Sequence, residues 1–158
     1  MTLEDTGMLT ALRHDPGITL LDRAQAKTPE ETKKIYHDAL SSDFYFMSTN
    51  AITKDGELVN IDGTGNRVAA LIYGPEHVIV MAGMNKVAAN VDEALSRVHG
   101  TATPMNCKRL GKNTPCSATG VCSDCLSPDC ICNQVVITRR SGIEGRIKVI
   151  LIGEELGY

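Results

Sequence analysis

The sequence has no apolar run that approaches the roughly 20 residues needed to cross a bilayer. Its first fifteen residues are acidic and amphipathic, whereas a secretory signal is basic and then apolar. These two absences predict a cytoplasmic protein with no membrane span. Cysteines in a reducing compartment seldom form structural disulfides, so the six cysteines of the chain indicate metal binding or thiol chemistry.

The sequence also lacks a block of like charge. Sixteen Lys and Arg residues against nineteen Asp and Glu residues give a formal net charge of -3, which is typical of a mixed, solvated surface. No nucleic acid partner is expected, because phosphate binding needs clustered basic residues. The G-x-S-x-G, H-E-x-x-H and P-loop patterns are absent too, and the four histidines are scattered. No catalytic residue follows, and enzyme status is left open.

A chain of 158 residues suits a single domain with one core. Apolar and β-branched runs predict strands, and the Asp55-Gly56 turn signal predicts a hairpin. Periodic spacing and capping residues predict helices, two of them capped by Thr28 and Asn90. The strands are expected at 44–48, 51–53, 57–59, 77–82, 134–138 and 146–152, and the helices at 2–13, 29–41, 68–72 and 90–98. This alternation favours an α/β fold with a mostly parallel sheet covered on both faces, ending in an antiparallel pair of strands.

A cysteine-rich segment, residues 107–132, holds all six cysteines and few large apolar side chains. Such a segment cannot easily order itself through a core of its own. Four thiolates satisfy tetrahedral zinc or complete the ligands of an iron–sulfur cluster. Cys122 and Cys125 have the two-residue gap that lets two sulfurs meet at one metal, with one further cysteine on each flanking arm. The predicted ligands are Cys116, Cys122, Cys125 and Cys132.

The spacing leaves several alternatives open. Cys130 is one residue from Cys132, so either could be the fourth ligand. Zinc and an iron–sulfur cluster fit equally well, because the spacing matches neither common ferredoxin pattern. A redox disulfide between Cys122 and Cys125, or a set of inert cysteines, would also explain the segment. Cys107 lies on an apparent helix and is expected to be a small buried thiol.

A glycine-containing loop, residues 63–67, enters a predicted helix. Free backbone N–H groups and the positive end of a helix dipole can bind an anion at such a place, and Arg67 can add a bidentate hold. Asn50, Thr53, Asn60 and Asp62 are close in sequence, so polar groups are expected around one crevice at the strand ends. A tight structural turn would have the same sequence.

Several segments match one known family over nearly the whole chain. They are MTLEDTG at 1–7, STNAITKDG at 48–56, NIDGTGNRVA at 60–69, TPC at 114–116, CSDC at 122–125, SPD at 127–129, ICN at 131–133 and GEELGY at 153–158. Together they resemble the LUD family, named for lactate utilisation and including LutC- and YkgG-type proteins, of which this would be a branch with a C-terminal cysteine cluster. The chain is therefore interpreted as a single LUD-like domain, residues 1–158.

The resemblance implies a three-layer α/β/α fold like that of ribose-5-phosphate isomerase, glucosamine-6-phosphate isomerase and the CoA-transferases. It implies a role near the oxidation of lactate or related 2-hydroxy acids, with iron–sulfur oxidoreductase subunits as partners. By analogy, the Thr2-Leu3 turn and the loop at 63–67 would line a crevice for a small anionic metabolite. The full set of expected anion-binding residues is Thr2, Leu3, Asn50, Thr53, Asp62, Gly63, Gly65, Asn66 and Arg67.

Family members usually carry a further βα unit before the position of Met1. Without it a sheet edge is exposed, which a homodimer or another chain would cover, although a truncated sequence explains the difference equally well. Three functions follow as hypotheses: a metal- or iron–sulfur-containing component of 2-hydroxy-acid oxidation, an isomerase- or transferase-like enzyme on a phosphorylated or CoA-linked molecule, and a non-enzymatic interaction subunit with structural zinc.

Overall fold

The structure, a computed structural model, describes residues 2–158 and contains two sheets. The first is wholly parallel, in the order β1–β4–β7, with strands Phe44–Ser48, His77–Gly83 and Ile147–Ile152. The second has the order β5–β2–β3–β6, with strands Val87–Ala88, Ala51–Thr53, Leu58–Asp62 and Gln134–Thr138. The chain passes from the first sheet to the second between β1 and β2, through Thr49 and Asn50. The mixed α/β class with a mostly parallel sheet is as predicted, and it is consistent with a three-layer α/β/α fold.

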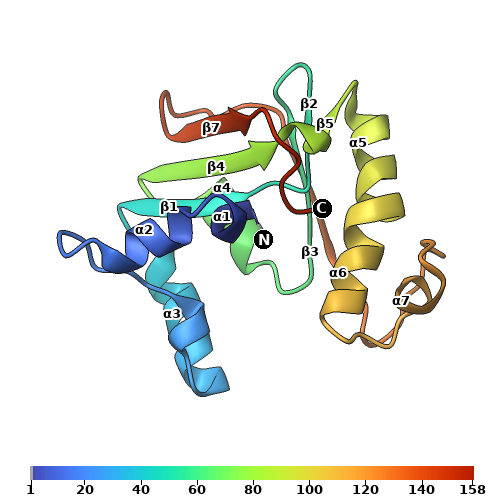
Figure 1. Cartoon of the computed structure of the whole chain (residues 1–158), viewed down its shortest axis with the longest axis horizontal. Coiled ribbons are helices and arrows are strands. Elements are labelled where there is room, and N and C mark those ends of the chain that lie inside the picture. The colour runs from blue at the N-terminus through green and yellow to red at the C-terminus, as the bar shows by residue number, and fades with distance from the viewer. Residues whose placement is uncertain (1) are drawn as a thin grey trace.

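The helices cover the sheets from separate sides, as Figure 1 shows. One group includes α1, α2 and α3, and the other is a column formed by α5 and α6 with α7 beside it. The α-helices span Thr2–Asp5, Met8–His14, Pro29–Ala39, Asn66–Ile72, Val91–Arg97, Thr103–Arg109 and Pro115–Thr119, and the short helices η1 and η2 span Arg23–Gln25 and Met84–Lys86. A π-helical turn, η3 (Val98–Ala102), joins α5 to α6. No helix within residues 2–158 has the length and apolar character that a membrane span requires.

Both predicted helix caps are confirmed. Thr28 Oγ1 accepts the backbone N–H of Glu31 at 3.1 Å, and Asn90 Oδ1 accepts that of Glu93 at 2.9 Å. The helix expected at 2–13 is interrupted at Gly7, whose φ of +73° is a left-handed conformation that glycine adopts without strain. Two short helices therefore replace one.

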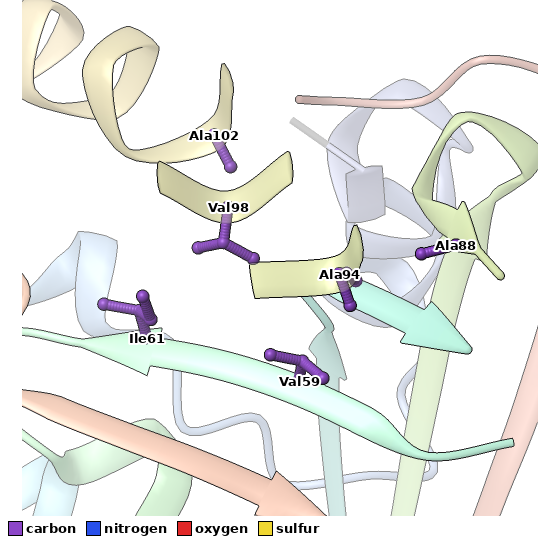
Figure 2. Packing of buried hydrophobic residues seen from close by; sticks show 7 residues of the cluster. Val59, Ile61, Ala88, Ala94, Val98 and Ala102 are labelled. Carbon is purple, nitrogen blue, oxygen red and sulfur yellow. The ribbon is translucent and has the colours of Figure 1, made fainter. Parts of the chain in front are cut away.

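The core is divided between the two sheets. Met47, Ile52, Leu58, Leu71, Val78 and Val80 form one buried cluster. The other lies between the second sheet and the α5–η3–α6 column, where small alanines let the helix approach the strands closely (Figure 2). That cluster consists of Ala51, Val59, Ile61, Ala88, Ala94, Val98 and Ala102. The column is thereby fixed against the strands, close to the point where the chain changes sheets.

The predicted pairing of the two C-terminal strands is wrong. β6 pairs antiparallel with β3, from Leu58 opposite Thr138 to Asp62 opposite Gln134. β7 pairs parallel with β4 in the other sheet. The polar connection between them, residues 139–146, resembles a hairpin loop in sequence but crosses from one sheet to the other.

Candidate functional site

The carboxyl ends of the three parallel strands point to one polar region, where α/β proteins usually bind ligands. Ser48 ends β1, and Lys86 follows β4 through a short connection. Thr2 opens α1, and Gly157 belongs to the segment after β7, which folds back onto Lys86 and Thr2. Four segments distant in sequence therefore meet here.

Lys86 is the centre of this region. Only 3% of its surface is exposed, and its Nζ donates to Thr2 Oγ1 and to Ser48 Oγ, each at 2.9 Å. The ion pairs within residues 2–158 do not include Lys86. Burial, together with the positive charges of Arg97 and Arg67, lowers the pKa of Lys86 to about 8, while Asp5 opposes the shift.

Arg97 supplies a second cation beside an open cavity of about 460 Å³. Its Nε donates to the backbone oxygen of Asn85 at 2.8 Å, and its Nη1 donates to that of Asn50 at 2.6 Å. Burial lowers the pKa of Arg97, because a charged guanidinium prefers water. The cavity is lined by Asn85, Val87, Ala88, Glu93, Arg97, Thr101, Met105, Glu155, Gly157 and Tyr158.

Arg67 has its four terminal donors engaged within the protein. Nη1 donates to the Ser48 carbonyl at 3.1 Å and to Asn60 Oδ1 at 2.5 Å. Nη2 donates to Asn50 Oδ1 at 2.8 Å and to the Ile61 carbonyl at 2.9 Å. The guanidinium therefore holds the chain together where it crosses between sheets. Burial lowers the pKa of Arg67, and the nearby Asp62 carboxylate opposes that shift.

Comparison of the sequence with models of protein families identifies the family of this chain. A family model for the LUD domain matches residues 1–152. The chain belongs to the LUD domain family. That membership relates it to lactate utilisation. No curated protein matches the chain significantly, and no solved structure does so either.

In this LUD domain the glycine-containing loop is capped by the protein itself. The Asp62 carboxylate accepts the backbone N–H groups of Arg67 and Val68, at 3.1 and 3.2 Å, at the start of α4. Gly65 takes a φ of +89°, and Gly63 packs closely against Ile131 in the cysteine-rich segment. An anion at this loop would compete with a carboxylate already in place, and its binding there stays a prediction.

The other residues predicted to bind an anion lie in different surroundings. Thr2 contacts Lys86, as described, while Leu3 is half-buried in α1. Asn66 is the first residue of α4. The Thr53 hydroxyl donates to Glu57 Oε2 at 3.2 Å, at the end of β2 where the hairpin turns. The Thr53 hydroxyl is therefore bonded within the hairpin and does not contact Lys86.

Sequence reasoning missed Lys86 and Arg97. Asn85 and Lys86 follow an apolar strand directly, so the rule that ligands bind beyond strand ends could have identified Lys86. Arg97 lies on a helix that reads as an ordinary amphipathic surface helix. Its role depends on packing against Asn50, 47 residues away in sequence, and no local pattern reports that contact.

The predicted metal ligands are not brought together. All six cysteines are free thiols, and residues 2–158 contain no group of three or more His, Cys, Asp or Glu side chains placed to hold a metal ion. Cys122 Sγ lies 3.4 Å from Nδ1 of His99, in the π-helical turn. Cys116 is buried in α7, with its Sγ 3.3 Å from the Thr114 hydroxyl. This arrangement does not fit a four-cysteine centre.

The sulfurs that do interact form a different set. Cys107, buried in α6 as expected, contacts Cys116, and the nearby Cys130 also acts on its pKa. Cys132 contacts Cys130, and the nearby Cys107 also acts on its pKa. Burial raises the pKa of Cys132 to about 12 and also raises that of Cys107. Both thiols are therefore protonated at neutral pH. A metal would have to displace these protons in order to bind.

Proposed function

We propose that this LUD domain binds a small carboxylate, a 2-hydroxy acid such as lactate or its 2-oxo counterpart, in the cavity beside Arg97, whose Gly157 wall lies against Lys86, as a cytoplasmic component of lactate oxidation. The observation that supports this is the positive charge of two cations outside any ion pair of residues 2–158, the buried Lys86 and the half-buried Arg97. Burying an unpaired charge is costly, and a bound carboxylate would offset part of that cost.

The crevice also offers groups that match the remainder of such a ligand. Arg97 engages Nε and Nη1 on backbone oxygens, so Nη2 can donate to a carboxylate in the cavity. Behind the Gly157 wall, the hydroxyls of Thr2 and Ser48 can bond the 2-hydroxyl or 2-oxo oxygen once that segment moves. Arg97 and these hydroxyls favour a small anion with a further polar oxygen, while Glu93 and Glu155 on the same cavity wall oppose it by like charge.

Calorimetric titration and thermal unfolding with lactate, pyruvate and inorganic phosphate test the proposal. At a lactate concentration of about 100 times Kd, the free energy of unfolding should rise by roughly 2.7 kcal/mol. Arg97→Gln should weaken lactate binding at least tenfold, whereas Arg140→Gln, on an exposed residue outside the crevice, should not change it. A shift with phosphate alone would favour an isomerase- or transferase-like function. No response to any 2-hydroxy or 2-oxo acid would refute the carboxylate site.

The cysteine-rich segment is a second element of the proposal. We infer that it binds zinc or an iron–sulfur cluster through Cys116, Cys122, Cys125 and Cys132, with Cys130 as an alternative to Cys132. The density of thiols supports this, and the segment has to rearrange to bring these sulfurs together. Anaerobic purification followed by iron, zinc and sulfide analysis tests it. One zinc per chain indicates a structural site in an interaction subunit, iron with sulfide indicates a cluster, and neither metal above background removes the ligand set.

A further inference from the structure

The amine of Lys86 is separated from the cavity by a single glycine. Gly157 lines the cavity, and a Cβ placed on it would lie 3.4 Å from Lys86 Nζ and 2.8 Å from Thr2 Oγ1. Its φ is +62°, a conformation that suits glycine. A residue larger than glycine at position 157 would therefore clash with Thr2 Oγ1. The amine thus lies immediately behind the wall of the proposed carboxylate site.

We propose that Lys86 forms an imine with 2-oxo acids that enter this cavity, a covalent activity that rests on the carboxylate site proposed above. Four groups carry the proposal: the Lys86 amine, the hydroxyls of Thr2 and Ser48 beside it, and the Arg97 guanidinium that faces the cavity. A 2-oxo acid carries a carbonyl directly attached to a carboxylate. Arg97 can therefore hold the carboxylate while Lys86 reacts with the adjacent carbon.

The step balances without an oxidant or a cofactor. The lone pair of neutral Nζ attacks the carbonyl carbon, forms the C–N bond and gives a carbinolamine after proton transfer from nitrogen to oxygen. Loss of that hydroxyl as water, with the second nitrogen proton leaving, forms the C=N bond. The hydroxyls of Thr2 and Ser48, each 2.9 Å from Nζ, are placed to pass these protons.

The environment keeps part of the amine unprotonated at neutral pH. With the pKa of Lys86 near 8, about a quarter of the amine is neutral at about pH 7.5, against roughly 0.1% for a solvated lysine. No carboxylate forms an ion pair with Nζ within the described residues. A buried lysine of this kind is a suitable nucleophile toward carbonyls.

The segment that carries Gly157 must move for the carbonyl to reach Nζ. Three hydrogen bonds hold it. Asn85 Oδ1 accepts the Leu156 N–H at 3.2 Å, and Asn85 Nδ2 donates to the Gly157 carbonyl at 3.3 Å. Thr2 Oγ1 donates to the Leu156 carbonyl at 3.3 Å. The hydrogen bonds are long, but Leu156 is only 7% exposed, so displacing the segment costs these bonds and the apolar contacts that Leu156 loses.

Reductive trapping tests the imine. The whole chain is incubated with pyruvate and cyanoborohydride at about pH 7.5, and adducts are located by peptide mass spectrometry. We expect Lys86 to be labelled at least tenfold faster than any other lysine of the same molecule, with excess lactate protecting it. The other lysines are internal controls that require no folded variant. Lys86→Met should lose the preferred adduct, and Lys54→Met, on the exposed hairpin, should keep it.

The outcomes separate this inference from the carboxylate site. If pyruvate binds by calorimetry but labelling is absent or spread evenly over the lysines, the imine is refuted and the carboxylate site stands. If neither pyruvate nor lactate binds, both proposals fail. Selective labelling of Lys86 that lactate suppresses supports both.

Discussion

Replacing Arg67 distinguishes a structural guanidinium from a ligand-binding one. The sequence pattern predicts that Arg67→Ala weakens anion binding and leaves the fold intact. In the structure, Arg67 instead donates four hydrogen bonds to Ser48, Asn50, Asn60 and Ile61. Its removal therefore deprives the crossing between the two sheets of its central donor, and the main effect should be on stability.

The size of that effect follows from the acceptors that are left behind. Hydrogen bonds from a charged donor contribute about 1.5–3 kcal/mol each, but they are not additive. Asn60 Oδ1 would still accept from the Asn50 N–H, and Asn50 Oδ1 from the Ile61 N–H, so those two acceptors keep a partner. The Ser48 and Ile61 carbonyls would lose a donor, which costs roughly 1–3 kcal/mol for each one that water cannot reach. Relief of the guanidinium's own burial offsets part of this loss. We expect a net loss of about 3 kcal/mol.

Urea unfolding followed by circular dichroism measures this loss directly. Arg67→Ala should lower the midpoint without changing the m-value, and Arg67→Lys should recover less than half of the loss, because one ammonium cannot reach four acceptors. Arg140→Ala, at an exposed position, is the matched control and should change stability by under about 0.5 kcal/mol. A loss below about 1 kcal/mol in Arg67→Ala, together with abolished lactate binding, would show that Arg67 acts on the ligand and that our structural reasoning is mistaken.

Three further substitutions follow from the same contacts. The pKa of Lys86 is 10.5 in the unfolded chain and about 8 in the folded chain, so the unfolded chain binds more protons between these pH values. The free energy of unfolding should therefore rise from pH 8 to pH 10.5 by up to ~3 kcal/mol in the wild type, and not in Lys86→Met. Urea titrations at each pH would measure this. Gly157→Ala forces a Cβ to within 2.8 Å of Thr2 Oγ1 at a φ of +62°, so it should cost about 1–3 kcal/mol in chemical denaturation, while Gly153→Ala has open space and should be near neutral. Arg146 donates to the carbonyls of Ala70, Leu71 and Pro75, and Arg146→Ala should lower stability by about 3 kcal/mol; a shift in melting temperature equal to that of Arg139→Ala would contradict the role.

Local signals were enough to predict most of the elements, because their causes lie within a few residues. Thr28 and Asn90 cap helices through contacts only three positions away. The pairing of β6 and β7 was not predictable in this way. Neighbouring strands in sequence usually pair, and here the chain uses residues 139–146 to reach another sheet. β6 and β7 pair with the edges of β3 and β4 that β2 and β1 leave free, and which edge is free is a tertiary property.

The candidate site shows the same division. A rule about strand ends directs attention to the carboxyl ends of the parallel strands, where Lys86 lies, and the family resemblance assigned Thr2 to a ligand crevice. The sequence does not show which cation is available to bind a ligand. Arg67, Lys86 and Arg97 differ in the groups that surround them and not in their local sequence. Arg67 is saturated by acceptors, whereas Lys86 meets two hydroxyls and Arg97 faces a cavity. Availability for a ligand is therefore set by partners distant in sequence.

The cysteine-rich segment shows why spacing alone does not establish a ligand set. The spacing of cysteines in the sequence indicates which sulfurs a single turn can bring together. A helix that carries a cysteine then fixes the position of its sulfur. Cys116 is fixed in α7 by the Thr114 cap, and Cys122 lies against His99 in the π-helical turn. Because no metal-ligating group is assembled within residues 2–158, a metal bound by both requires α7 or the Cys122 loop to move. Metal affinity would therefore include the cost of that rearrangement, and binding should alter the helical content of residues 98–119 as well as the cysteines.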